Sequence, residues 1–480
     1  MGIEMTEKAD VVFLSGKFRV IHAGHMRLFR TAIDFGQKLV VALDISELSE
    51  EEVLWRKGIL ENIEYVDEVV NFDGDVEGIL RSIRPSIVIK GHEFRNAENI
   101  ETRVLAEYGG KIIFTSGASF YSENDLIGSS DSEFIQKLAP LPQDFMARNG
   151  ITTGRLIQLI ESFSRLRVCV IGDLIIDEYI NCHPLGMSQE EPTVVVTPID
   201  SKRFFGGAGI VAAHANSLGA STSLLTVTGQ DETSEWALKK AFEYELKCLI
   251  VEDPTRPTTL KQRYRSGTQT LLKISHLTQD FLDSEKEKEL IAKFSSLAEN
   301  LDVVIFSDFS YGVLSPYVVE QILATALKNN VFISADSQSS SQIGNLGKFR
   351  CVGLISGTER EARMELKDNT SGLAVVAESL RSQLEAKNLL LKMGGDGVLI
   401  SAIDDSGEIL ATDEISAINK NPIDTSGAGD SMLAGASLAL ASGANIYEAA
   451  LVGSVLAGVQ VGRLGNTPIS QATINSVLQL

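Results

Sequence analysis

The sequence predicts an α/β protein built from two doubly wound parallel-sheet domains, and three features support that prediction. Short apolar runs alternate with helical patterns between residues 11 and 115. The alternation resumes at residue 167 and continues past residue 391. Between the two series, residues 128–150 carry neighbouring serines and two prolines, which interrupt the pattern. Strands that alternate with helices favour parallel sheets whose two faces are both covered.

The first series predicts a small domain over residues 1–128. Its apolar runs are expected to form strands, and a helix is expected near residues 26–35. The expected strands are residues 11–14, 39–43, 66–72, 86–89 and 111–115.

The second series predicts a larger domain over residues 165–480, preceded by a linker and an amphipathic helix over residues 129–164. Segments 179–205 and 255–275 alternate polar and apolar side chains, so we expect them to form antiparallel strands of a small lid. The expected strands of the main sheet are residues 167–173, 223–227, 303–306, 331–333, 352–355 and 388–391.

The composition limits the classes of function. The chain has 480 residues, 44% hydrophobic and 22% charged, a balance typical of soluble globular proteins. Its net charge of −21 argues against nucleic acid or an anionic membrane as the main partner. Residues 1–10 lack the apolar core of a signal peptide, and no apolar run reaches the length of about 18 residues that spans a membrane, so we expect a cytoplasmic protein. The four cysteines are scattered, as expected for reduced thiols.

The most informative motif is the heptapeptide Asp-Thr-Ser-Gly-Ala-Gly-Asp at residues 424–430. Its small residues leave backbone N–H groups uncovered, and the apolar run 432–440 predicts that a buried helix begins there. Such a helix N-terminus suits the negative charge that develops on a transferred phosphoryl group. Asp430 stands beside that site, where its carboxylate could take a proton from an attacking hydroxyl.

This heptapeptide resembles the anion-hole and catalytic-base motif of the ribokinase-like (PfkB) carbohydrate kinases. The glycine block 206–209 and the strand-and-turn segment 391–397 extend the resemblance, in the family's order, over about residues 165–470. The resemblance implies a ribokinase-like fold with a small β lid. It also implies ATP and Mg²⁺ as cofactors and phosphoryl transfer to a sugar hydroxyl.

The resemblance also implies roles for single residues. Asp430 would be the base, and the amides of Gly427, Ala428 and Gly429 would form the anion hole. Glu361 would hold Mg²⁺ through water, with a solvated helix face as the alternative interpretation. The implied nucleotide-site residues are Asp424, Thr425, Lys392, Gly394 and Gly397.

The sugar end of the same site is expected at the lid. Candidate substrate contacts are Asp173 and Asp177 after a strand end, Gly206 and Gly207 of the glycine block, and Lys261 and Arg263 on the lid. The two lid cations could bind a phosphate or could simply be solvated. The resembling heptose kinases have lysines where this chain has Tyr311 and Gln338, so the preferred sugar could differ.

A second site is predicted directly after the first strand, because ligands bind at the carboxyl ends of parallel strands. His22 and His25 stand at the start of a helix, where both imidazoles can face phosphates held by the helix N-terminus. Two other interpretations stay open. One is a zinc site, which would need two further ligands, and the other is an ordinary helix start.

Residues 22–25 resemble the HxGH motif of the cytidylyltransferase-like nucleotidyltransferases, and the similarity covers about residues 10–128. It implies a nucleoside triphosphate, ATP or CTP, at this site. The family's acid is Arg19 here and its basic stretch is shortened, so possible nucleotide contacts are missing. The implied contacts are Gly16, Lys17, Phe18, Arg56, Lys90 and Ser122.

Together the two halves resemble the bifunctional heptose 7-phosphate kinase/heptose 1-phosphate nucleotidyltransferases, in reversed order. The resemblance implies sugar phosphates and nucleotides as the small-molecule partners. The resemblance also implies a homodimer, because lid strands in such kinases have exposed edges that often pair between subunits. Two alternatives remain: a carbohydrate kinase with a catalytically dead nucleotide-binding N-terminal domain, and a non-enzymatic sugar or nucleotide sensor.

Overall fold

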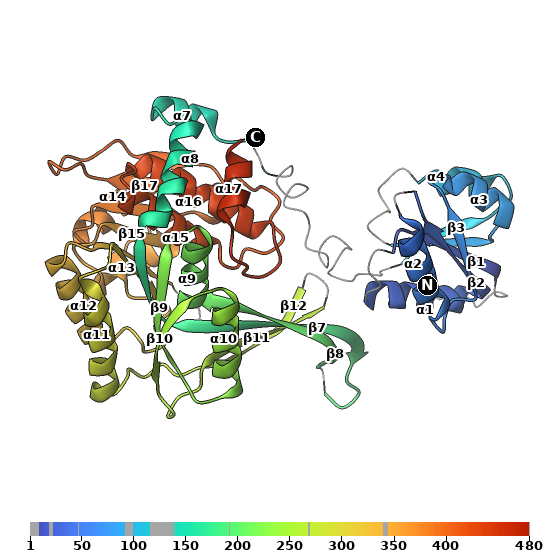
Figure 1. Cartoon of the computed structure of the whole chain (residues 1–480), viewed down its shortest axis with the longest axis horizontal. Coiled ribbons are helices and arrows are strands. Elements are labelled where there is room, and N and C mark those ends of the chain that lie inside the picture. The colour runs from blue at the N-terminus through green and yellow to red at the C-terminus, as the bar shows by residue number, and fades with distance from the viewer. Residues whose placement is uncertain are drawn as a thin grey trace. The chain divides into compact units, whose positions relative to one another are not determined.

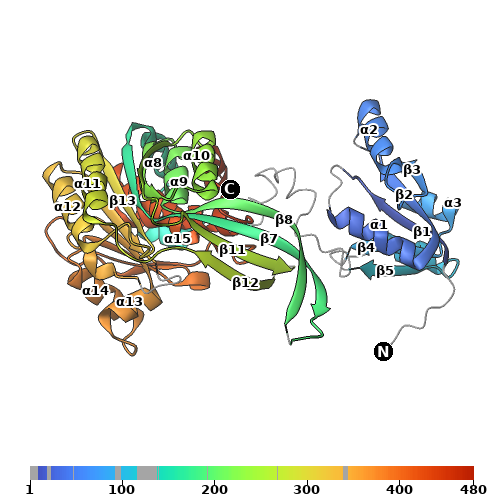
Figure 2. The same cartoon turned by 90° about the horizontal axis from the view of Figure 1, so that it is seen from below.

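The chain divides into two compact units, Met1–Ser130 and Asp131–Leu480. The computed structural model describes residues 9–18, 23–46, 48–91, 99–115, 138, 140–191, 193–266, 269–338 and 344–479. Figures 1 and 2 show the elements of each unit from two directions. Within the described residues, no helix combines the length and the apolar character that a membrane crossing requires.

The first unit is a five-stranded parallel sheet in the order β3-β2-β1-β4-β5. All five expected strands are confirmed. The strands are β1 (Ala9–Gly16), β2 (Gly36–Asp44), β3 (Glu68–Phe72), β4 (Ile87–Gly91) and β5 (Lys111–Thr115). The helices are α1 (Ala23–Phe35), α2 (Glu50–Glu61), α3 (Val76–Ile83) and α4 (Ile100–Ala106).

Alternate side chains of β1 enter two different cores. Val12 and Leu14 pack with Phe29 of α1, whereas Phe13 packs with Leu80 of α3 on the opposite face. The strand is therefore apolar without alternation, as expected for a parallel strand buried on both faces.

The second unit contains a nine-stranded sheet in the order β10-β9-β6-β13-β14-β15-β16-β17-β18. The strands are parallel from β10 to β16, and β17 and β18 are antiparallel additions at one edge. The strands are β6 (Arg167–Gly172), β9 (Ser221–Thr228), β10 (Lys247–Glu252), β13 (Val303–Asp308), β14 (Phe332–Ser337), β15 (Leu354–Thr358), β16 (Asn388–Lys392), β17 (Val398–Ala402) and β18 (Asp413–Ile415).

Helices cover both faces of this sheet (Figure 2). One core packs against α8 (Thr153–Ser162), α9 (Ala208–Ser217), α10 (Glu232–Glu243), α15 (Ala428–Ala441), α16 (Ile446–Val461) and α17 (Gln471–Leu478). The other packs against α11 (Ser284–Ala298), α12 (Pro316–Lys328), α13 (Glu359–Leu366) and α14 (Leu373–Gln383).

Helix α15 is held closely in the first of these cores. A Cβ at Gly435 would stand 2.1 Å from Cδ1 of Leu456 in α16, so the small residue permits the close approach of the two helices. The Ser437 hydroxyl donates to Ser334 Oγ of β14 at 2.7 Å. These contacts fix the position of the helix whose N-terminus carries the 424–430 motif.

The described part of the expected linker packs onto the second unit. Helix α7 (Gln143–Arg148) ends in an arginine that pairs with Asp413 at 2.6 Å, and Arg155 of α8 pairs with Glu448 at 3.2 Å. Helix α8 lies where the amphipathic helix was expected, and it buries Leu156 in the core.

The lid is a four-stranded sheet in the order β12-β11-β7-β8, formed by β7 (Leu174–Met187), β8 (Val194–Gly207), β11 (Thr259–Ser266) and β12 (Gln269–His276). The lid itself is confirmed, but the expectation that its strands are all antiparallel is wrong, because β7 and β11 pair in parallel. Polar and apolar alternation reports that one face of a strand is exposed and says nothing of the direction of its neighbour. In Figure 2 the far ends of β7 and β8 extend away from the body of the second unit.

Candidate active site

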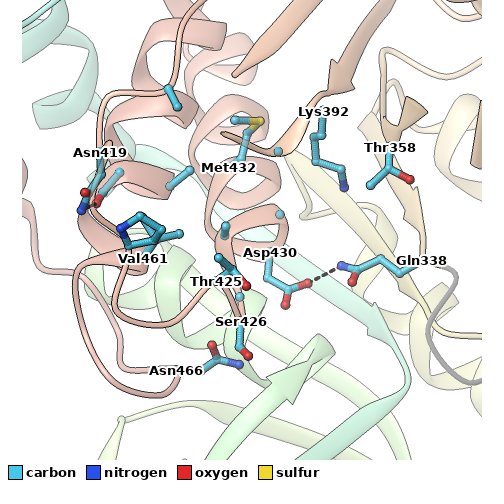
Figure 3. Close-up of a pocket in the computed structure, with 18 of the residues that line it drawn as sticks. Gln338, Thr358, Lys392, Asn419, Thr425, Ser426, Asp430, Met432, Val461 and Asn466 are labelled. Carbon is cyan, nitrogen blue, oxygen red and sulfur yellow. Dashed lines mark hydrogen bonds between the residues drawn. The ribbon is translucent and has the colours of Figure 1, made fainter. Parts of the chain in front are cut away.

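One cavity of about 460 Å³ in the second unit gathers residues that are far apart in the sequence. Figure 3 shows part of its lining, with Asp430, Lys392 and Thr425 around the space. The expected site residues that line it are Asp177, Gly206, Gly207, Lys261, Arg263, Glu361, Lys392, Gly394, Gly397, Thr425, Gly427, Ala428, Gly429 and Asp430. The structure therefore brings together in one cavity nearly all the residues that the sequence assigns to the kinase half.

The N-terminus of α15 opens into this cavity. Gly427 caps the helix in the left-handed region, with φ of 77°, and a Cβ there would stand 2.1 Å from Asn466 Oδ1. Only glycine fits that position. A Cβ at Gly429 would stand 3.1 Å from the Lys392 ammonium, so a cation lies beside the first helical turn. The dipole of α15 and the Lys392 ammonium together make this end of the cavity suited to an anion.

Asp430 lies in the first turn of the same helix and is only 5% exposed. Its Oδ1 accepts a hydrogen bond of 2.7 Å from the side-chain amide of Gln338, the dashed line in Figure 3. Burial and the nearby Asp336 carboxylate raise the pKa of Asp430 to about 7, against the opposing charge of Lys392. A carboxylate with that pKa can accept a proton near neutral pH.

Lys392 and Asp336 form a buried ion pair beneath the helix terminus, with Nζ and Oδ2 2.6 Å apart. Burial raises the pKa of Asp336 to about 6, although Lys392 opposes that shift. Burial lowers the pKa of Lys392, but the charges of Asp336 and Glu361 outweigh it and raise that pKa overall. The lysine is therefore held in its charged form.

Glu361 is buried at the start of α13 and lines the cavity. Its Oε2 accepts the backbone N–H of Thr358 at 2.7 Å, and the Thr358 hydroxyl accepts the N–H of Glu361 in return. This capping box positions the carboxylate, so the alternative of a solvated helix face is wrong for Glu361. The described part of the chain contains no cluster of three or more acidic, histidine or cysteine side chains that could hold a metal ion.

The lid contacts the 424–430 loop through a polar network that the sequence analysis did not predict. Arg263 pairs with Asp177 at 3.0 Å and donates to the Ser426 hydroxyl at 2.7 Å. The Tyr179 hydroxyl lies 2.8 Å from Asp424 and 3.1 Å from Ser426. Asp424 also accepts the N–H groups of Ser426 and Gly465, so it shapes the loop and does not line the cavity.

The lid end of the cavity combines the Phe309 ring with the cations of Lys261 and Arg263. The Lys261 ammonium lies 5.1 Å from the ring centre of Phe309 and 4.9 Å from that of Tyr311, within the range of a cation–π interaction. Burial raises the pKa of Asp177, and the nearby cations Arg263 and Lys261 oppose the shift.

The expectation that Asp173 contacts the sugar is wrong for the described structure. Its carboxylate accepts the backbone N–H groups of Phe309 at 2.7 Å and Tyr311 at 3.3 Å, and it is 1% exposed. Asp173 does not line the cavity. It holds the loop after β13, which in turn presents Phe309 to the sugar end.

The opposite end of the cavity is largely apolar. Its lining includes Ile418, Met432 and Val461, together with the polar Asn419. The sequence analysis missed these residues, because they follow no glycine-rich or acidic motif. Such a wall suits the flat base of a nucleotide.

The candidate residues of the first unit collect at the carboxyl end of β1. The Phe18 ring packs on Gly16 and lies 5.1 Å from the ring centre of His25. Arg56, from α2, donates to the carbonyl of Lys17 at 3.1 Å. Lys90, at the end of the adjacent β4, pairs with Glu101 at 2.7 Å. His22 and Ser122 lie outside the described residues.

Comparison with known proteins places this geometry in a family. Residues 165–473 match the pfkB family carbohydrate kinases. A protein named "Bifunctional protein HldE" from Trichlorobacter lovleyi is 30% identical over 328 residues, 67% of this chain and 65% of that protein. One of the same name from Geotalea uraniireducens is 31% identical over 315 residues, 64% of this chain and 62% of that protein. The chain thus spans less than two thirds of the length of these curated relatives.

Solved structures share the fold of the second unit. Phosphofructokinase-2 from Escherichia coli, in complex with substrates and products, superposes with a TM-score of 0.53 at 15% identity, covering 65% of this chain and 99% of that one. Ribokinase from Arabidopsis thaliana, complexed with ribose and ATP, superposes with a TM-score of 0.52 at 16% identity, covering 66% of this chain and 99% of that one. The matched residues include the cavity, Asp430 and the bare N-terminus of α15, and the chain belongs to the PfkB family of carbohydrate kinases.

Proposed function

We propose that the second unit transfers the γ-phosphoryl group of ATP to a hydroxyl of a phosphorylated sugar similar to heptose 7-phosphate. The observation that supports this most is the single cavity in which Asp430, the N-terminus of α15 and Lys392 face the lid cations. The proposed base, the site for the transferring phosphoryl group and the cations for the substrate therefore lie in one cavity, as phosphoryl transfer requires.

The chain's own groups account for the chemical step. Asp430 accepts the proton of the sugar hydroxyl, whose oxygen forms a bond to the γ-phosphorus. The bond from that phosphorus to the bridging oxygen breaks, and ADP leaves. The amides of Gly427, Ala428 and Gly429 and the Lys392 ammonium stabilise the charge on the transferring group.

The nucleotide would lie with its base against the apolar end of the cavity, beside Met432 and Val461. Mg²⁺ would neutralise the phosphate oxygens of ATP, and the buried Glu361 carboxylate would contact it through water. Gly394 and Gly397 of the turn after β16 would line the path of the phosphates.

At the sugar end, Asp177 would accept a hydroxyl of the substrate, and Lys261 and Arg263 would face its phosphate. Arg263 is already paired with Asp177, so the two lid cations and one carboxylate leave a net positive charge at this end. A net positive charge favours an anionic sugar over a neutral one.

For the first unit we propose nucleotidyl transfer from ATP or CTP to a sugar 1-phosphate, with release of pyrophosphate. The name of the relatives and the grouping of Lys17, His25 and Arg56 at the end of β1 support this proposal. The whole chain would then be a bifunctional sugar-activating enzyme of nucleotide-sugar and glycan precursor synthesis. Its free cysteines suit the cytoplasm, where ATP is abundant.

The test is ³¹P NMR of the full chain with Mg-ATP and heptose 7-phosphate, and then with sugar 1-phosphates and ATP or CTP. We expect a new sugar bisphosphate with ADP from the first mixture, and pyrophosphate with a nucleotide diphosphate sugar from the second. The variant Asp430→Asn should lose only the first reaction, and His25→Ala only the second.

ADP formation without pyrophosphate in every mixture would reject the transferase half and leave a kinase with an inactive N-terminal domain. Neither product in any mixture, with binding of sugar or nucleotide retained, would reject both activities in favour of a sensor.

A further inference from the structure

Gln338 lines the cavity and bridges two buried carboxylates, those of Asp430 and Asp336. It directly follows β14, and its backbone N–H donates to the carbonyl of Asp308 at 2.8 Å, which fixes the start of the side chain. Its Nε2 donates to Asp430 Oδ1 at 2.7 Å (Figure 3). The same Nε2 lies 3.3 Å from Asp336 Oδ2. Of the side chains that the structure describes, Gln338 is the one that donates a hydrogen bond to Asp430.

The bridge connects the base to the anion site. Asp336 Oδ2, the oxygen near Gln338, is also the oxygen that binds Lys392, and Lys392 lies beside the first turn of α15. Asp430, Gln338, Asp336 and Lys392 therefore form one connected series of contacts. A carboxylate that must accept a proton at one oxygen needs its other oxygen held, because misplacement by a fraction of an ångström is costly in rate.

We propose that Gln338 is a positioning residue for phosphoryl transfer, whose side-chain amide holds Asp430 by Oδ1 in the orientation that accepts the proton of the sugar hydroxyl. This inference rests on the proposed role of Asp430 as the base.

The side-chain amide of Gln338 is uncharged, and this affects the basicity of Asp430, as the position of the amide also does. The charged groups that act on Asp430 are Asp336 of β14, Lys392 of β16 and Asp177 of β7, and Glu361 of α13 acts on the Asp336–Lys392 pair. An amide donates a hydrogen bond without adding a cation to this set. Asp430 therefore remains a stronger proton acceptor than it would be beside a further ammonium group.

Two substitutions separate position from charge. Gln338→Met keeps the length of the side chain and removes the donor, and Gln338→Lys keeps a donor and adds a charge. We expect Gln338→Met to lower kcat about 10- to 100-fold with the KM for ATP little changed, and to move the acid limb of the pH–kcat profile to higher pH. We expect Gln338→Lys to move that limb to lower pH.

The matched control is Gln230→Met, which removes a 3.1 Å hydrogen bond between Gln230 and Glu252 outside the cavity. It should leave kcat and the pH profile unchanged. Melting temperatures establish whether each variant folds. If Gln338→Met does not fold, the expected shift of the acid limb to lower pH in Gln338→Lys is the test.

Two results would overturn the inference. One is a wild-type kcat and pH profile in both Gln338 variants. The other is a change confined to the KM of the sugar phosphate, which would make Gln338 a substrate contact. Failure of the base assignment itself is distinguishable, because Asp430→Asn would then turn over at the wild-type rate.

Discussion

At the scale of single residues, the buried position of Asp430 predicts how the kinase responds to pH. Its pKa is raised from 3.8 to about 7, chiefly by burial, so the carboxylate is largely protonated below neutrality. A protonated base cannot accept the hydroxyl proton. We therefore expect kcat to fall about tenfold per pH unit below pH 7 and to reach a plateau above it.

The substitution Asp430→Asn should lower kcat by about 10²–10⁴-fold and remove the acid limb, while ATP affinity measured by calorimetry stays nearly unchanged. Asp404→Asn, in the exposed turn after β17, is the control and should behave as wild type. Near-normal turnover in Asp430→Asn would reject its assignment as the base.

The same pKa has a consequence for stability. The folded state binds a proton more tightly than the unfolded state, so the Asp430 contribution to stability is lost as pH rises from about 4 through 7. Asp430→Asn removes the cost of the buried charge. Its melting temperature at alkaline pH should not fall below that of wild type, which would separate loss of activity from loss of folding.

Residues of the site were predictable where they share one short segment of sequence. The motif at 424–430 carries its glycines and its acid together, so a candidate anion site with Asp430 beside it could be predicted from local backbone chemistry, and the resemblance to the kinase family added the roles of these residues. Gln338 lies 92 positions from Asp430 and meets it only because β14 ends beside α15. The prediction for Asp173 was wrong for the converse reason. A strand end predicts that a side chain is near the site, and here the carboxylate turns toward the backbone of the neighbouring loop instead.

At the scale of elements, the lid and the anion-hole loop are joined through two lid strands. Tyr179 of β7 and Arg263 of β11 both reach the Ser426 hydroxyl, and the Tyr179 hydroxyl also reaches Asp424. Both strands also carry candidate sugar-site residues that line the cavity, Asp177 on β7 and Lys261 on β11. The lid and the 424–430 loop are thus joined by direct side-chain contacts, which predicts that their positions are coupled.

We expect Tyr179→Phe to lower kcat about fivefold, the effect of losing about 1 kcal/mol from one hydrogen bond at the loop. Combined with Ser426→Ala, it should be non-additive, with a coupling energy of about 0.5–3 kcal/mol in a double-mutant cycle. Tyr264→Phe, one position beyond Arg263 and on the other face of β11, is the control. Strict additivity in the cycle would show that the contacts do not couple lid and loop.

The elements themselves were largely predictable. Continuous apolar runs marked the parallel strands because both faces of each sheet are buried, as the two cores on either side of β1 illustrate. The parallel pairing of β7 with β11 was not predictable, since it depends on how the chain between them crosses the unit. Helix α15 was expected from its small apolar residues, and its tight packing on α16 explains why those residues are small.

At the scale of the whole molecule, positively charged side chains gather at one cavity although the protein is acidic overall. The chain carries a net charge of −21, yet Lys261, Arg263 and Lys392 converge on one cavity. In the proposed function, this local concentration of cations would let an acidic protein bind the phosphates of ATP and of a phosphorylated sugar. The net charge by itself argues against a polyanion as the main partner and does not bear on a small anionic substrate.

The outer half of the lid predicts self-association. Strands β7, β8 and β12 expose apolar side chains that do not line the cavity, among them Leu185 at 62%, Met187 at 61%, Val194 at 55% and Leu272 at 54%. β8 and β12 are the edges of this sheet, with a row of backbone groups available for pairing. An apolar face with open edges favours a partner sheet of the same kind, and a second copy of the chain supplies one.

We therefore expect a homodimer in sedimentation velocity at micromolar concentration, formed through the two lids. Met187→Asp places a charge on the exposed end of β7 and should shift the protein to monomer without lowering its melting temperature. Trp55→Asp, a change of a 63% exposed residue in the first unit, should leave the dimer intact. A wild-type protein that sediments as a monomer would reject the prediction. A dimer that survives Met187→Asp but dissociates with Trp55→Asp would place the interface on α2 of the first unit instead.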